Sequence, residues 1–170
     1  EMKKQYFSKD SEKTLAEQVV DSEPVEGIRL LTLKRGSGVI TINGNLVGGD
    51  IYADKNNTRI PDLVSSMLDQ GTTKQTKFEI SDKLERAGAR LSISNGKSNV
   101  GFYAKFLSDD LDMVLGLLSE QLQHPAFNEE DLEKAKKRMI TSYKRKKEST
   151  RGSAVDNMLT NFYPKGHQNA

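Results

Sequence analysis

The sequence predicts an α+β domain with a mostly antiparallel sheet and with helices packed on one face of that sheet. Predicted strands come in two groups, at residues 27–47 and 90–107, and each group is interrupted by a turn instead of a helix. Predicted helices are also grouped and do not alternate with single strands, which argues against parallel βαβ units. The chain has 170 residues, 35% of them apolar and 29% charged, which suffices for one core of moderate size.

The N-terminal part is polar and charged, and we interpret residues 1–25 as a linker with a short amphipathic helix in 8–20. The domain proper then covers 26–170. Residues 27–33 alternate apolar and polar side chains, as residues 39–47 do, and glycines between them suit a hairpin turn. The two segments are therefore predicted to pair with each other.

A helix is predicted over residues 60–69, because apolar residues share one of its faces and a proline lies in its first turn. The sequence Thr-Lys-Phe-Glu at 76–79 is a capping box and predicts a second helix, which stops at Gly88. Strands are predicted at 90–94 and 99–107, and the Asn-Gly-Lys turn between them indicates a hairpin.

Three helices are predicted after these strands. Polar residues 108–110 cap the first, which ends before Pro125, and residues 128–131 cap a long second one. The last predicted helix covers 153–162.

Charge and hydropathy exclude several kinds of partner. The formal net charge of +2 gives no reason to expect nucleic acid, and no apolar run approaches the roughly 20 residues that span a bilayer. Eight Lys and Arg residues lie between 134 and 147 with no acid among them. Acids come first and bases last in this predicted helix, as the helix dipole favours, so we interpret the basic run as a solvated face. We therefore expect neither a nucleic-acid partner nor a membrane span.

The residue inventory also limits the chemistry. The chain has no cysteine and two histidines, so a zinc site would need His124, His167 and carboxylates. Ser65 and Ser66 could be proposed as nucleophiles, but no histidine lies in the same predicted helix to act as their base. Gly48 and the glycines near it lack the spacing of phosphate-binding loops.

Five segments, in collinear order, resemble parts of one known family. They are a glycine-rich strand end at 46–50, a helix with Met-Leu-Asp-Gln-Gly-Thr at 67–72, a helix at 80–89, the segment 115–127 with its Pro-Ala-Phe end, and Tyr-Pro-Lys-Gly-His at 163–167. From Gly27 to the C-terminus, the chain is thereby similar to the insulinase, pitrilysin and mitochondrial-processing-peptidase family of zinc metallopeptidases.

Active members of this family carry His-x-x-Glu-His on the first of these helices. The two histidines bind zinc, the glutamate polarises the attacking water, and a downstream glutamate completes the ligand set. The matching positions here hold Asp62, Ser65 and Ser66, and the downstream position falls near Ser142 or Tyr143. The resemblance therefore implies that this domain has no catalytic residues of its own and binds no metal or other cofactor.

Members of this family are commonly built from two homologous halves or subunits that close around a peptide, with zinc in only one of them. The resemblance implies that this chain is the non-catalytic, substrate-enclosing part of a zinc metallopeptidase. Its expected partners are a homologous zinc-bearing domain or subunit and a peptide substrate, and a further strand-bearing segment is expected after residue 170. The expected substrate-binding residues are Val47, Gly48, Gly49 and Asp50.

One alternative function stays open at this stage. The same fold could serve as a structural or assembly subunit without any peptidase role. The compartment stays open as well, between the bacterial periplasm or cell envelope and the cytoplasm.

Overall fold

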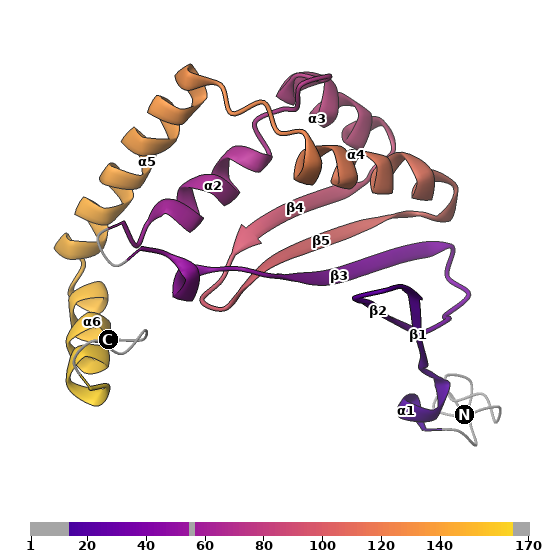
Figure 1. Ribbon diagram of the computed structural model, residues 1–170, viewed down its shortest axis with the longest axis horizontal. Coiled ribbons are helices and arrows are strands. Elements are labelled where there is room, and N and C mark those ends of the chain that lie inside the picture. Colours follow the sequence, from indigo (N-terminus) through magenta and orange to yellow (C-terminus); the bar gives the residue numbers. More distant parts are fainter. Residues whose placement is uncertain (1–13, 55–56, 165–170) are drawn as a thin grey trace, which may run out of the picture. The chain divides into compact units, whose positions relative to one another are not determined.

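The computed structural model describes residues 14–54 and 57–164 (Figure 1). The chain divides into two compact units, residues 1–37 and residues 38–170. In the described residues of the first unit, helix α1 (Leu15–Gln18) precedes strands β1 (Val20–Val25) and β2 (Ile28–Thr32), which pair antiparallel. Of the helix predicted in 8–20, residues 8–13 lie outside the described residues, and the described part is helical only over α1.

The predicted pairing of residues 27–33 with 39–47 is wrong. Strand β2 pairs with β1, and Val25 lies opposite Ile28, so only two residues form the turn. One of them, Gly27, has φ 80°, which suits the tight turns that match the twist of a hairpin. This turn is shorter than the connection from β2 to β3 (Val39–Val47), and β3 pairs along its whole length with a distant strand instead.

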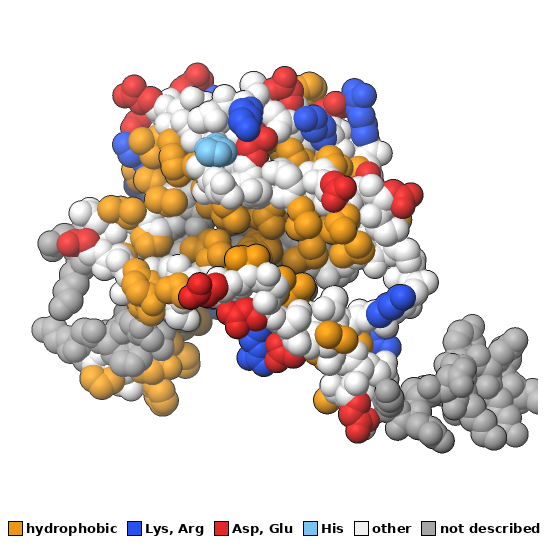
Figure 2. Space-filling view, turned by 45° about the vertical axis from the view of Figure 1, so that its right-hand side comes forward, with side chains coloured by type: hydrophobic (Ala, Val, Ile, Leu, Met, Phe, Trp, Pro, Cys, Tyr) orange, Lys and Arg blue, Asp and Glu red, His pale blue; other side chains and the backbone are white. Residues whose placement is uncertain are grey.

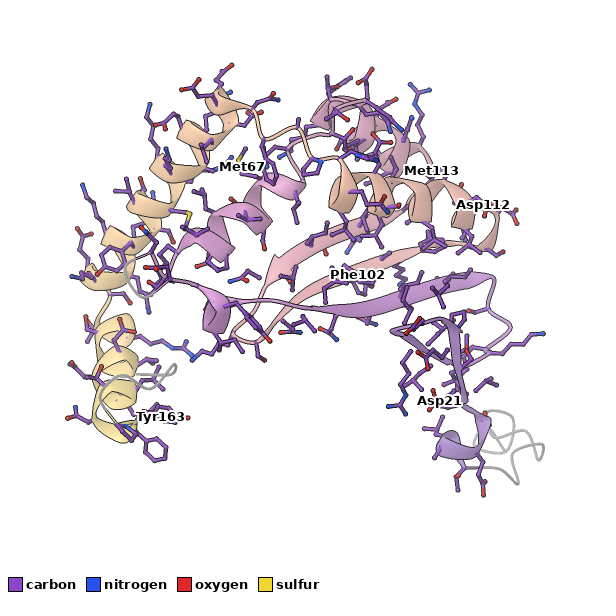
Figure 3. All side chains as sticks on the ribbon, viewed as in Figure 1. Asp21, Met67, Phe102, Asp112, Met113 and Tyr163 are labelled. Atoms are coloured by element: carbon purple, nitrogen blue, oxygen red, sulfur yellow. The ribbon has the colours of Figure 1, made fainter. Side chains whose placement is uncertain are left out.

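The sheet of the second unit has the order β3-β5-β4, with β4 (Arg90–Asn95) and β5 (Asn99–Leu107) joined as the predicted hairpin. Both pairings are antiparallel, so β5 is central and β3 and β4 are the edges of this sheet. Phe102 of β5 lies against Gly44 of β3 and fills the space that a side chain at position 44 would need (Figure 3). A ring that covers a strand glycine in this way restores cross-strand packing.

Helices cover one face of this sheet (Figure 1). They are α2 (Ile60–Leu68), α3 (Lys77–Arg86) and α4 (Leu111–Gln123), with short 3₁₀ turns at Asp50–Tyr52 and Ser108–Asp110. The core cluster consists of Ala89, Ala104, Phe106 and Val114, all buried between sheet and helices. The described residues therefore confirm the predicted α+β class with an antiparallel sheet and helices on one face.

Two further helices complete the described chain: α5 (Glu129–Glu148), which packs against α2, and α6 (Thr150–Phe162), which packs against α5. Figure 2 shows hydrophobic side chains in a band across the middle of one face, below a rim of charged side chains. On α5 and α6, Ile140, Tyr143 and Met158 are 56%, 49% and 60% exposed. Within the described residues, no helix is long and apolar enough to cross a membrane.

One of the predicted helix caps is confirmed and two others make no capping hydrogen bond. The capping box is confirmed, because the Thr76 hydroxyl accepts from the Glu79 N–H at 3.3 Å and Glu79 accepts from the Thr76 N–H at 2.7 Å. The side chains of Asp110 and Asn128 make no capping hydrogen bond. At Asp110 the 3₁₀ turn runs directly into α4 with φ −95° and ψ 7°, whereas an N-cap side chain is aimed by an extended backbone. Helix α6 begins at Thr150, three residues before the predicted start, and Ser149 caps it.

A carboxylate of α4 helps to hold the loop between α2 and α3, beside the backbone hydrogen bond from Thr73 N–H to the His124 carbonyl at 2.9 Å. Glu120 accepts from the hydroxyl of Thr72 and, at 2.8 Å, from the side-chain amide of Gln75. The hydrogen bond from Thr72 holds the pKa of Glu120 below its ordinary value, against a smaller opposing effect of burial, with further help from Gln75 and nearby lysines. This loop position is therefore tied to the ionised form of Glu120.

This tie predicts an acid-dependent loss of stability. A carboxyl whose pKa is lower in the folded state contributes stability above its unfolded pKa of about 4.3 and loses that contribution as pH falls through the folded value. Glu120→Gln should therefore show a shallower fall in the free energy of unfolding between about pH 5 and pH 3 than the unsubstituted chain. Urea denaturation across this range measures it, with Glu148→Gln at the exposed end of α5 as the control. An equal slope for both variants would contradict the role of Glu120.

Candidate functional site

Three elements meet at Asn95, the last residue of β4. The Asn95 side-chain N–H group donates to Asp50 at 2.6 Å and to Asp62 at 2.9 Å. Asp50 begins the 3₁₀ turn after β3, and Asp62 lies in the first turn of α2. One amide therefore joins the region predicted to bind substrate to the first position of the degenerate zinc motif.

Asn95 is a functional candidate that the sequence did not reveal. Its place before Gly96 indicated only a hairpin turn, and its two partners lie 45 and 33 residues away. The Asn95 Oδ1 atom is buried without a hydrogen-bond partner among the described residues. The amide orientation is nevertheless determined, because a carbonyl oxygen turned toward two carboxylates would be repelled and only the N–H group can donate.

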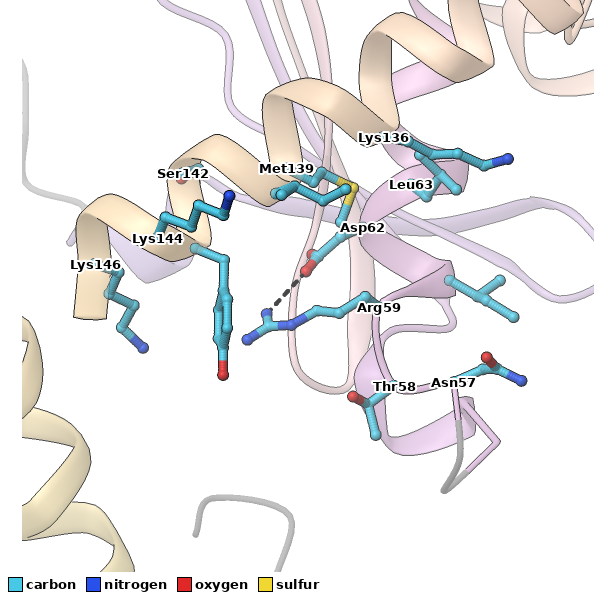
Figure 4. Close-up of a pocket in the computed structure, with 13 residues that line it drawn as sticks. Asn57, Thr58, Arg59, Asp62, Leu63, Lys136, Met139, Ser142, Lys144 and Lys146 are labelled. Carbon is cyan, nitrogen blue, oxygen red and sulfur yellow. Dashed lines mark hydrogen bonds and ion pairs between the residues drawn. The ribbon is translucent and has the colours of Figure 1, made fainter. Parts of the chain in front are cut away.

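Asp62 is held on its other side as well. Its Oδ2 accepts from the Arg59 guanidinium at 3.2 Å (Figure 4). Its Oδ1 accepts from Asn95. About a third of the Asp62 side chain is exposed, at 34%. Both carboxylate oxygens thus already have donors.

The two serines at the motif positions are not available as nucleophiles: one is buried and the hydroxyl of the other is hydrogen-bonded within α2. Ser65 is buried at 6% exposure, and the Ser66 hydroxyl donates to the Leu63 carbonyl at 2.8 Å. In the described part of the chain, no hydrogen bond joins either serine to a histidine: His124 ends α4, and His167 lies outside the described residues. Among the described residues, neither serine is therefore paired with a histidine that could act as its base.

Residues 57–63, at the start of α2, and residues within 136–146 of α5 line an open groove of about 950 Å³. Its lining includes Asp62 together with Ser142 and Tyr143, so the fold brings the first motif position to the predicted downstream position. Ser65 and Ser66 do not line it. Lining residues also include Arg59, the N-cap residue of α2, and Lys144 of α5 (Figure 4).

These residues do not fit a zinc ion. In 14–54 and 57–164, no group of three or more His, Cys, Asp or Glu is placed to hold a metal. Among the motif positions at the groove, only Asp62 carries a ligand that zinc commonly takes, and its oxygens accept from Arg59 and Asn95. We therefore derive no chemistry through zinc on this domain.

In the segment Val47–Asp50, the backbone conformation and its close neighbours require a glycine at position 49. Gly49 has φ 100°, and a Cβ there would lie 2.8 Å from the Asn99 nitrogen and 2.9 Å from the Lys97 carbonyl carbon. Beyond it, the Asp50 N–H donates to the Gly96 carbonyl at 3.1 Å. Val47 is 86% exposed at the end of β3, whereas Gly49 is buried. Contact of Val47, Gly48, Gly49 and Asp50 with a substrate stays a prediction.

The fold and the site together define a class: an α+β domain with helices on one face of a three-stranded antiparallel sheet and without a metal-binding group among its described residues. Residues 45–169 match the model of a protein family described as "Insulinase (Peptidase family M16)". The chain therefore belongs to the insulinase family, as the sequence resemblance predicted.

Relatives of the chain include an alpha and a beta subunit of mitochondrial-processing peptidase. The chain is 25% identical over 134 residues to the mitochondrial-processing peptidase subunit alpha-1 of Dictyostelium discoideum, covering 79% of this chain and 20% of the relative. It is 26% identical over 117 residues to the mitochondrial-processing peptidase subunit beta of Caenorhabditis elegans, covering 69% of this chain and 25% of the relative. An uncharacterized zinc protease of Rickettsia felis is 27% identical over 119 residues, covering 64% and 29%. The chain thus spans less than a third of the length of these relatives.

Solved structures share the fold. A peptidase M16 inactive domain from Pseudomonas fluorescens superposes with a TM-score of 0.76 at 20% identity, covering 89% of this chain and 37% of that chain. A protease from Helicobacter pylori superposes with a TM-score of 0.68 at 16% identity, covering 81% and 33%. These likenesses confirm the fold of a family half-domain.

Proposed function

We propose that this chain is a non-catalytic, substrate-enclosing part of a two-part zinc metalloendopeptidase. The observation that carries the proposal is the state of the motif helix. Asp62 is engaged by Arg59 and Asn95, Ser65 is buried, and the Ser66 hydroxyl is bonded within α2. The family fold is kept while the residues that would supply the chemistry are replaced.

The sheet offers a way to hold a peptide. In the described sheet β4 pairs only with β5, so its outer edge has backbone groups free to bond an extended chain. Asn95 at the end of this edge is joined to Asp62, which lines the groove. A peptide added to β4 would therefore run toward the groove, where its side chains can be enclosed. Val47, Gly48, Gly49 and Asp50 belong to the proposed surface, in a domain proposed to begin near residue 26.

The proposal needs a partner that supplies zinc. Two of the relatives, from different organisms, are named as an alpha and a beta subunit of mitochondrial-processing peptidase, and a third is named a zinc protease. These names support a homologous zinc-bearing domain or subunit as the partner, located either in the same polypeptide or in another. In the assembled enzyme, the metal would supply the activated water, and this chain would bind and orient the peptide.

The test combines the chain with its zinc-bearing homologue and follows cleavage of a fluorogenic extended peptide. We expect no cleavage by this chain alone, cleavage by the mixture well above that by the homologue alone, and loss of cleavage with a zinc chelator. The same peptide, N-methylated at alternate residues, should bind this chain more weakly because it lacks donors for the β4 edge. Cleavage that never depends on this chain would contradict the proposal and favour a structural subunit.

A further inference from the structure

The groove between α2 and α5 has a charge that the proposed function alone does not explain. Its cationic lining residues are Arg59, Lys136, Lys144 and Lys146, and Asp62 is its one acidic lining residue. Both oxygens of Asp62 already accept hydrogen bonds. Positive charge is therefore in excess along the walls.

The basic run of α5 supplies most of this charge. Lys136 pairs with Glu133 at 2.7 Å and Lys146 with Asp156 at 2.7 Å, and all four of these side chains are about half exposed. Exposed pairs of this kind contribute little and exchange readily with solvent or with another carboxylate. Lys144 has no ion pair with any residue in 14–54 or 57–164. The groove thus presents one unpaired and two weakly paired ammonium groups.

Between these cations the groove is apolar. Ile60 and Ile140 are 49% and 56% exposed, and Tyr143 is 49% exposed, with the Lys147 ammonium over its ring at 5.0 Å. The basic face is solvated, as the sequence predicts, but along the groove its side chains stand beside these exposed apolar ones. A phosphate backbone would match the charges but would leave the apolar walls uncovered. An occupant must cover the walls and also supply carboxylates.

We propose that this groove binds a peptide segment in which an apolar side chain is flanked by Asp or Glu. The apolar side chain lies against Ile60, Ile140 and Tyr143, and the carboxylates pair with Lys136 and Lys144. This inference rests on the proposed function, because the segment is part of the enclosed peptide. It adds a substrate class: a preference for acidic segments in the groove that Asp62, the first motif position, lines.

The experiment measures binding of fluorescein-labelled dodecapeptides to the 170-residue chain by anisotropy. One peptide carries leucine flanked by glutamates, a second carries glutamines in their place, and a third carries lysines. We expect the glutamate peptide to bind about tenfold more tightly than the glutamine peptide at low salt, with the lysine peptide weakest. The difference should shrink at about 0.5 M salt, where surface charges are screened.

Matched variants locate the preference. With Lys136→Glu combined with Lys144→Glu, the glutamate and glutamine peptides should bind about equally. Lys137→Glu combined with Arg145→Glu changes the net charge equally on the same helix, at positions outside the groove lining, and should keep the preference. Ile140→Ser should weaken the glutamate and glutamine peptides by a similar factor. Circular dichroism and thermal melting verify that each variant is folded.

The outcomes separate this inference from the proposed function. Equal binding of the glutamate and glutamine peptides to the unsubstituted chain overturns the inference, and so does equal loss in both double variants. Displacement of the glutamate peptide by an equimolar 20-nucleotide single strand also overturns it in favour of nucleic acid. If the glutamine peptide still binds and N-methylation weakens it, the proposed function stands without the acidic preference. If no extended peptide binds, both fail.

Discussion

Replacing Asn95 by aspartate is expected to lower the free energy of unfolding by about 2–3 kcal/mol at neutral pH. The Asn95 amide donates to the carboxylates of Asp50 and Asp62, at 2.6 and 2.9 Å. Asn95→Asp removes both donors and places a third carboxylate against the other two. The loss combines two broken hydrogen bonds with repulsion between like charges.

The penalty should depend on pH in a defined direction. Neighbouring carboxylates raise the folded pKa of the introduced carboxyl above its unfolded value of about 3.9. Such a group binds its proton more tightly in the folded state, so stability falls as pH rises from about 3.9 through the folded value. The variant should therefore be close to the unsubstituted chain near pH 3 and furthest from it at pH 7. Urea denaturation at several pH values measures this difference.

A control lies in the same hairpin. Asn99 donates from its side chain to Asn45, an uncharged partner, so Asn99→Asp introduces the same group without the two carboxylates. Its penalty should be smaller and should change less between pH 3 and pH 7. If the two variants lose equal stability at neutral pH, the Asn95 bridge does not hold β4, α2 and the turn after β3 together.

Replacing Met67 by alanine is expected to cost about 2–4 kcal/mol of unfolding free energy. Met67 is 1% exposed on α2, the helix that packs against both β4 and α5 (Figure 3). Truncation leaves a cavity that a close-packed interior fills only in part. Because α2 forms one wall of the groove, peptide binding should weaken along with stability.

The control for this change is another methionine. Met158 of α6 is 60% exposed, so Met158→Ala should alter stability by no more than about 0.5 kcal/mol. Thermal and urea denaturation of both variants, with matching denaturant slopes, make the comparison direct. A similar loss for both would show that α2 is not anchored through Met67.

Local signals predicted many elements well. Strand β3 was predicted at 39–47 and β5 at 99–107, as observed, because period-two alternation and turn residues act within a few positions. The capping box at Thr76 was also confirmed, since its two hydrogen bonds span three residues. The degenerate motif was equally readable, because it depends on residue types at fixed spacing along one helix.

Strand pairing and the contacts within the site were harder to predict from the sequence. The glycines at 36 and 38 suggested one hairpin, but the two-residue turn at Gly27 gave β2 another partner. Asn95 was interpreted as a turn residue, since nothing in its neighbours indicates carboxylates 33 and 45 positions away. The basic run of α5 is exposed, as the sequence predicts, but periodicity does not tell which face meets α2, so the sequence does not show that part of the run lines a groove.

The sequence by itself determined the family, the α+β class and the replacement of the zinc-binding positions by Asp62, Ser65 and Ser66. These follow from local patterns and residue identities. Only the tertiary structure decided that Asn95 joins Asp50 to Asp62 and that Lys144 faces a groove with Asp62 and Tyr143. The physical reason is that packing α2 against β4 and α5 brings together groups whose distance in space does not depend on their separation in sequence.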